Sequence, residues 1–119
     1  MNSDGDQGER RAAQWLQEQG LHIIERNFRA RCGEIDIVAR DGAVLVFVEV
    51  RARRASRFAS AAASVTRPKQ ARLLRTAALY LQRHPHLASL ACRFDVVAIE
   101  PRQSAGAARL RWIRHAFTA

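Results

Sequence analysis

The apolar residues near the start of the chain recur at the spacing of an amphipathic helix. Asp6 and Glu9 precede this pattern at the spacing of a capping box, and Gly20 follows it as a stop signal. We therefore predict a helix that begins near Asp6 and ends before Gly20. Its apolar face consists of Ala12, Ala13, Trp15 and Leu16.

Strand patterns follow this helix. Residues 21–29 are β-rich, residues 34–40 alternate between polar and apolar, and residues 43–50 are an almost continuous run of Val, Leu and Phe. Asp41-Gly42 separates the last two segments and is a strong signal for a hairpin turn. A continuous apolar run is typical of a central strand buried on both faces.

A basic loop and a second helix come next. Residues 51–64 are rich in Arg, Ala and Ser, which favours a loop with a short helical turn. The helix is predicted from about Thr66 to Arg83, and His84-Pro85 ends it. Its inner stripe is predicted to consist of Leu74, Ala77, Ala78 and Leu81.

Two further strands, at residues 93–99 and about 109–117, complete the order αβββαββ. This order predicts an α/β fold in which helices flank a mixed sheet. The chain has 119 residues, of which 48% are hydrophobic and 26% charged. Such a balance fits one compact domain over residues 1–119 and excludes wholesale disorder and fibrous repeats, although we expect disorder in residues 1–5.

The sequence carries no membrane or secretion signal. Its longest apolar run, Ala43–Val48, is far shorter than the roughly 18 residues that a membrane helix needs. The first residues lack both a basic region and an apolar core, and Cys32 and Cys92 form no CxxC pair. We therefore expect a cytoplasmic protein with reduced thiols and no membrane partner.

Charge is distributed unevenly within the formal total of +9. Residues 1–50 carry 6 basic and 9 acidic side chains, whereas residues 51–119 carry 14 basic and 2 acidic ones. A basic half attracts polyanions because each cation that meets a phosphate releases a counterion. Charge alone favours nucleic acid over a merely solvated surface and leaves DNA, RNA and an acidic protein open as partners.

The buried strand contains a charged pair, Glu49 and Arg51, where apolar residues are expected. Burying a carboxylate is costly unless it has a partner. Because side chains alternate along a strand, this pair shares one face with Leu45 and Phe47.

A two-residue turn at Asp41-Gly42 fixes the predicted register of the hairpin. It sets these residues opposite each other: Arg40 and Ala43, Asp36 and Phe47, Glu34 and Glu49. Asp36 and Glu49 are then diagonal neighbours, about 7 Å apart or less. A divalent cation fits between two such carboxylates, and hard oxygen ligands favour Mg²⁺ or Mn²⁺ over zinc. The chemistry that this arrangement suggests is metal-assisted phosphodiester hydrolysis.

Four spaced segments carry a family resemblance: residues 33–38 (GEIDIV), 46–51 (VFVEVR), 65–70 (VTRPKQ) and 93–99 (RFDVVAI). In this order they resemble the signatures of the YraN family, and the resemblance covers about residues 8–117. That poorly characterised bacterial family is associated with the restriction-endonuclease-like PD-(D/E)xK fold and is similar to archaeal Holliday-junction resolvases.

The resemblance implies a metal site. It makes Asp36 the first metal-binding carboxylate and Glu49 the second, with the carbonyl of Val50 as an extra ligand. Glu9 corresponds to a helix glutamate that joins them in resolvase-like members, and its alternative role is the capping box with Asp6. Glu34 either binds the metal through water or pairs with an arginine, and the arginine pairing is preferred.

Arg51 occupies the position where the nuclease pattern has its catalytic lysine. A guanidinium stays charged and is bulkier than an ammonium, so Arg51 retains electrostatic stabilisation of the phosphate but not proton handling. The alternative is a structural Glu49–Arg51 ion pair in a domain that does not cleave.

A phosphate-binding segment is predicted around the start of the second helix. Thr66 suits the N-cap, and Arg67 and Lys69 stand at the positive end of the helix dipole, where a bound anion would offset their repulsion. The predicted nucleic-acid-binding residues are Arg53, Arg54, Arg57, Thr66, Arg67, Lys69 and Arg72. Asp95 is expected to form a salt bridge with Arg93 or Arg51 rather than bind metal.

Three hypotheses follow from these features. The first is a Mg²⁺- or Mn²⁺-dependent nuclease-like domain that binds DNA, including branched DNA, with Asp36, Glu49 and Arg51 at its catalytic centre. The second is a non-catalytic nucleic-acid-binding module on the same fold, and the third is a protein-interaction scaffold. A homodimer is suggested only by analogy with resolvases.

Overall fold

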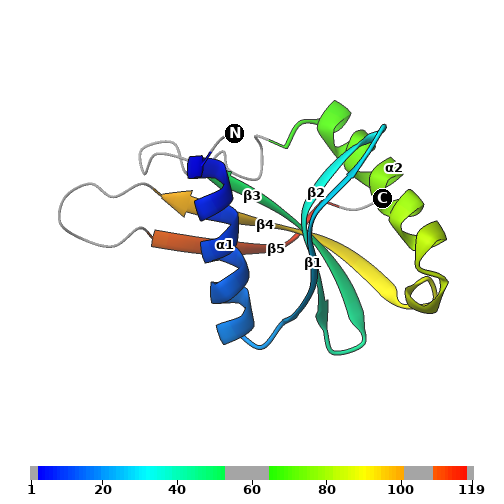
Figure 1. Ribbon diagram of the computed structural model, residues 1–119, viewed down its shortest axis with the longest axis horizontal. Helices are drawn as coiled ribbons and strands as arrows, with labels where there is room; N and C mark the ends of the chain where they lie inside the picture. The colour runs from blue at the N-terminus through cyan, green and yellow to red at the C-terminus, as the bar shows by residue number, and fades with distance from the viewer. Residues whose placement is uncertain (1–2, 53–64, 101–108, 118–119) are drawn as a thin grey trace.

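The computed structural model describes residues 3–52, 65–100 and 109–117 and shows three layers (Figure 1). A five-stranded sheet lies between two helices, with strand order β1-β2-β3-β4-β5. The elements are α1 (Ser3–Glu18), β1 (His22–Ala30), β2 (Gly33–Asp41), β3 (Val44–Ala52), α2 (Arg67–Arg83), the short 3₁₀ helix η2 (Pro85–Leu87), β4 (Ala91–Glu100) and β5 (Arg109–Phe117).

The predicted αβββαββ order and mixed sheet are confirmed. Neighbouring strands are antiparallel except β3 and β4, which run parallel because α2 crosses from one end of the sheet to the other between them. Apolar residues of α1 pack on one face of the sheet and those of α2 on the other. Within the described ranges, no helix combines the length and the apolar character needed to span a membrane.

Helix α1 has the predicted apolar face, and Ala12, Ala13 and Leu16 are buried. The predicted start is wrong, because the helix begins at Ser3 and Asp6 lies inside it. Residues 3–5, for which disorder was expected, belong to its first turn. The capping-box role for Glu9 is therefore excluded, and its carboxylate is left for other contacts.

Helix α2 begins and ends as predicted, but its buried stripe is displaced. Thr66 caps the helix, and its hydroxyl accepts a 3.4 Å hydrogen bond from the Lys69 N–H. Ala78 is exposed. The buried residues are Leu73, Thr76, Ala77 and Tyr80.

Thr76 explains why sequence periodicity misplaced this stripe. Its hydroxyl donates a 2.7 Å hydrogen bond to the Arg72 carbonyl, so the polar side chain is satisfied within its own helix and tolerates burial. Tyr80 lies edge-on to Phe28 and Phe47, with ring centroids 4.9 and 6.0 Å away. These contacts turn α2 toward the β1–β2 hairpin.

The predicted register of the β2–β3 hairpin is wrong by two residues. Arg40 pairs with Leu45 rather than Ala43, and Val38, not Asp36, pairs with Phe47. The turn residues are Gly42-Ala43, with Gly42 at φ +60°, as the first central position of a type II′ turn requires. A shift of two preserves which face each side chain occupies, so the predicted convergence of the carboxylates survives.

Buried Asp95 ties β5 to β4. It accepts hydrogen bonds from Arg93 Nε at 3.1 Å, Trp112 Nε1 at 2.8 Å and the His115 backbone N–H at 3.0 Å. The predicted salt bridge to Arg93 is therefore confirmed. His115 has φ +54° next to a register irregularity, and the bond from its N–H stabilises that conformation.

Replacing Asp95 by Ala is expected to lower the free energy of unfolding by about 3–5 kcal/mol. The reason is that the Arg93 guanidinium, on a side chain that is only 12% exposed, loses a buried carboxylate partner, and the Trp112 and His115 N–H groups lose their acceptor. Urea denaturation measures this change. Asp41→Asn is the matched control, since Asp41 contacts the same guanidinium but is 43% exposed, and it should cost less than about 1 kcal/mol. Equal costs for the two variants would contradict the assigned role of Asp95.

Candidate metal and nucleic-acid site

Asp36 lies where strands β2 and β3 separate. The last regular pair between them is Ile37 with Val48. Beyond it, the Val50 N–H donates a 2.8 Å hydrogen bond to Asp36 Oδ2 instead of to a backbone carbonyl of β2. The carboxylate thereby takes the place of a ladder partner and is held at the sheet with only 8% of the residue exposed.

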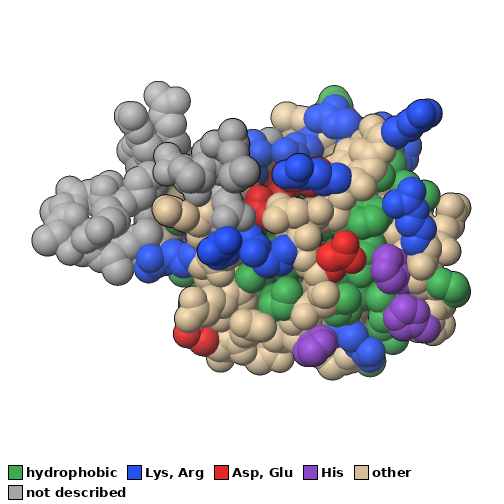
Figure 2. Space-filling view, in the orientation of Figure 1, with side chains coloured by type: hydrophobic (Ala, Val, Ile, Leu, Met, Phe, Trp, Pro, Cys, Tyr) green, Lys and Arg blue, Asp and Glu red, His purple; other side chains and the backbone are tan. Residues whose placement is uncertain are grey.

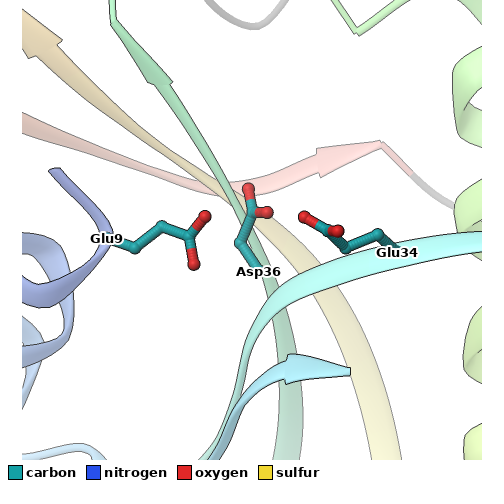
Figure 3. A group of neighbouring side chains, drawn as sticks. All are labelled: Glu9, Glu34 and Asp36. Carbon is teal, nitrogen blue, oxygen red and sulfur yellow. The ribbon is translucent and has the colours of Figure 1, made fainter. Parts of the chain in front are cut away.

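Two further carboxylates converge on Asp36. Glu9 reaches it from α1 and Glu34 from the start of β2, and one oxygen of each of the three lies within 4.8 Å of the others (Figure 3). Gly8 contributes to this approach, because a Cβ at that position would lie 3.3 Å from Ile99 of β4. We call Glu9, Glu34 and Asp36 the carboxylate group.

Glu34 forms the predicted pair with an arginine. Its Oε2 accepts a 2.8 Å salt bridge from Arg29 Nε, which bears out the preferred pairing with an arginine. The same residue also belongs to the carboxylate group. Glu34 is therefore both ion-paired with Arg29 and close to Asp36.

Glu49 is neutralised mainly by Lys69. Lys69 Nζ lies 2.6 Å from Glu49 Oε2, whereas the Arg51 guanidinium is 3.7 Å from the same oxygen. Glu49 is 5% exposed, so this lysine offsets the cost of burying its charge. The sequence predicted Lys69 only at a phosphate site, so its contact with Glu49 was missed. The one available signal was that Lys69 is the single lysine among 20 basic residues.

The surroundings of Asp36 favour its protonated form. Burial and the nearby negative charge of Glu49, with a smaller effect from Glu9, raise its pKa from 3.8 to about 9. The Val50 N–H opposes this rise by stabilising the carboxylate. A strongly raised pKa in a cleft marks a position that bound positive charge would convert to the ionised form.

These residues line a cavity of about 310 Å³. Its lining includes the carboxylate group and Glu49 together with three cationic residues, Arg51, Lys69 and Arg72. The space-filling view shows red carboxylate atoms bordered by blue Lys and Arg side chains beside α2 (Figure 2). Negative and positive groups therefore share one opening.

The predicted phosphate-binding residues fall into four groups. Lys69 and Arg72 line the cavity, and Arg67 is exposed at the start of α2. The Thr66 hydroxyl already serves as the helix cap. Arg53, Arg54 and Arg57 lie outside the described residues.

The fold and the site define an α/β domain with an acidic pocket under a basic rim. Residues 8–99 match the model of Uncharacterised protein family UPF0102, and the chain belongs to this family. The predicted YraN resemblance is thereby confirmed.

Relatives of the chain span a range of bacteria. The chain is 51% identical over 115 residues to a UPF0102 protein of Alkalilimnicola ehrlichii, covering 97% of this chain and 86% of the relative. It is 50% identical over 117 residues to a UPF0102 protein of Symbiobacterium thermophilum, covering 97% and 96% of the two chains. A Pseudomonas savastanoi pv. phaseolicola relative is 50% identical over 113 residues, covering 95% and 91%.

Asp36→Asn is expected to stabilise the metal-free protein at pH 7 by at least about 1 kcal/mol, since one pKa unit corresponds to about 1.4 kcal/mol. The folded-state pKa of Asp36 lies above its unfolded value, so wild-type stability should fall as pH rises between about 4 and about 9. Denaturation in a chelating buffer across this range measures both effects.

Glu34→Gln is the control for this test, because Glu34 is exposed, and it should change the unfolding free energy by less than about 0.5 kcal/mol. A loss of stability in Asp36→Asn would show instead that the ionised carboxylate supports the fold.

Proposed function

We propose that this protein is a cytoplasmic, divalent-metal-dependent nuclease-like domain that binds DNA and hydrolyses phosphodiester bonds. The observation that carries the proposal is the convergence of Glu9, Glu34 and Asp36 from two elements beside a cationic rim. The members of the carboxylate group lie close together although like charges repel, and a bound cation would offset this repulsion.

The donor set suits Mg²⁺ or Mn²⁺. All three members of the carboxylate group supply hard oxygen atoms, and no His or Cys belongs to it. Such an ion polarises a phosphoryl oxygen and lowers the pKa of bound water. Asp36 is the central ligand in this proposal, Glu9 and Glu34 flank it, and Glu49 and the Val50 carbonyl border the same cavity.

Lys69 takes over the role that the nuclease pattern gives to the lysine replaced by Arg51. Its ammonium lies within the cavity, 2.6 Å from Glu49 and one helical turn from Arg72. A compact ammonium on a helix reaches a phosphate oxygen or a water without the bulk of a guanidinium. Arg51 then serves as a second positive charge at the rim.

A non-catalytic DNA-binding module is the second candidate. It is favoured by the Glu49–Lys69 ion pair, which already neutralises one carboxylate without any metal. Both candidates require DNA binding that weakens with salt, whereas a protein-interaction scaffold does not. Metal binding and cleavage separate the first candidate from the second.

Isothermal titration with Mn²⁺ and cleavage assays on branched, nicked and linear DNA test the nuclease proposal. Wild type is expected to bind Mn²⁺ and cleave at least one of these substrates, and Asp36→Asn is expected to lose both activities. Asp41→Asn is the matched control on the same strand and should retain both, because Asp41 lies outside the carboxylate group. DNA binding without Mn²⁺ binding or cleavage would favour the non-catalytic module.

Variants of Lys69 and Arg51 test which cation acts at the phosphate. Lys69→Ala is expected to lower kcat about 100-fold or more with a smaller change in KM, the effect typical of removing one transition-state donor. Arg51→Ala should lower kcat less. A strong rise in cleavage in Arg51→Lys would assign the role to position 51 instead.

A further inference from the structure

A second basic surface borders the cavity on the side of the β1–β2 hairpin. The tip of this hairpin packs against α2: a Cβ on Gly33 would lie 2.9 Å from Thr76 Oγ1 and 3.7 Å from Arg72 Cβ. The Thr76 hydroxyl also lies 3.5 Å from Cys32 Sγ. Gly33 at φ +154° therefore allows the tip and the helix to form one continuous surface.

Five exposed arginines lie on the two elements that form this contact, the β1–β2 hairpin and α2. Arg83, at the far end of α2, lies with its guanidinium 5.7 Å from the Phe28 ring of β1, so the same flank of the helix faces the hairpin along its length. Helix α2 contains no acidic residue. We call this the hairpin–α2 surface; it consists of Arg29, Arg31, Arg72, Arg75 and Arg83.

The dimensions of the surface fit a nucleic-acid duplex. Arg72 and Arg83 are eleven positions apart in the sequence, which corresponds to about 16 Å along a helix axis. A duplex advances about 3.4 Å per base pair, so this row spans about five base pairs. Arg72 also lines the cavity, which places one end of the row beside the carboxylate group.

The chemistry of the surface favours backbone contacts. Recognition of single strands relies on exposed aromatic rings that stack on bases. The aromatic residues beneath this surface, Phe28 and Tyr80, are buried in the core. Arginines on a helix and a hairpin that pack together are instead held at fixed positions, which favours contacts to the regularly spaced phosphates of a nucleic-acid backbone.

We propose that the hairpin–α2 surface binds the phosphate backbone of double-stranded nucleic acid and leads the duplex to the carboxylate group. This inference rests on the proposed function and names its substrate class, a duplex rather than a single strand. Arg31 and Arg75 are the residues that distinguish it, because both are exposed and neither lines the cavity.

Binding to a duplex and to a single strand of equal length, measured in chelating buffer over a range of salt, tests the proposal without relying on cleavage. In the Arg31→Gln/Arg75→Gln double variant, duplex affinity should fall several-fold. The slope of log K against log salt should become shallower by about 1.8, since each phosphate contact contributes about 0.9. Single-strand binding should change much less.

Arg40→Gln is the matched control, because Arg40 lies at the opposite end of β2 from Glu34. It removes one arginine and should leave the duplex slope unchanged. Thermal unfolding should show that all variants remain folded, because the mutated side chains of the double variant are exposed.

Unchanged duplex binding in the double variant would overturn the proposal, as would equal losses for duplex and single strand. Wild-type binding to an acidic peptide in preference to both nucleic acids would also overturn it. Failure of the nuclease proposal has a different signature, since a protein that cleaves nothing would still show the duplex-specific loss.

Discussion

The hydrogen bond from the Val50 N–H to Asp36 determines the geometry of this protein's site. Regular pairing of β2 and β3 stops at Ile37 and Val48, and the carboxylate accepts the next available donor. A buried N–H must find a partner, and here the partner is a side chain that is costly to bury. The same hydrogen bond therefore accompanies the separation of β2 and β3 and fixes the position of the Asp36 carboxylate.

The charged groups around the cavity act differently on Asp36 and on Glu49. Burial and the charge of Glu49, with a smaller effect from Glu9, favour the protonated form of Asp36. Lys69 instead neutralises Glu49, with its Nζ 2.6 Å from Glu49 Oε2. Two carboxylates at the cavity are therefore paired with cations, Glu49 with Lys69 and Glu34 with Arg29, and Asp36 is buried beside them.

The extent to which sequence predicted this site follows from strand geometry. Alternation placed Glu49 on the face of Leu45 and Phe47, and this placement does not depend on the register, because it follows from the period of two within the strand. The register error of two residues also keeps opposed side chains on one face. The register depended on which residue begins the two-residue turn. An Asp41-Gly42 turn suits type I′, and a Gly42-Ala43 turn suits type II′, so the sequence is compatible with both. The capping-box pattern around Glu9 failed for a similar reason, since a local motif carries no information about how far a helix extends before it.

Contacts between distant elements were beyond reach from the sequence. Periodicity in α2 favoured Ala78, but packing selected Thr76 and Tyr80 through a satisfied hydroxyl and two aromatic contacts. The rotation of α2 about its axis that buries these residues also sets the direction of the charged residues on the helix.

With Leu73, Thr76 and Tyr80 facing the sheet, Lys69 reaches Glu49, while Arg72 lines the cavity and Arg75 is exposed. The same packing that buries α2 therefore decides which cation neutralises the acidic pocket and which ones extend away from it. A helix turned to bury Ala78 would face the sheet with a different set of residues, so the core of this domain and the charge pattern around its pocket are set by one rotation.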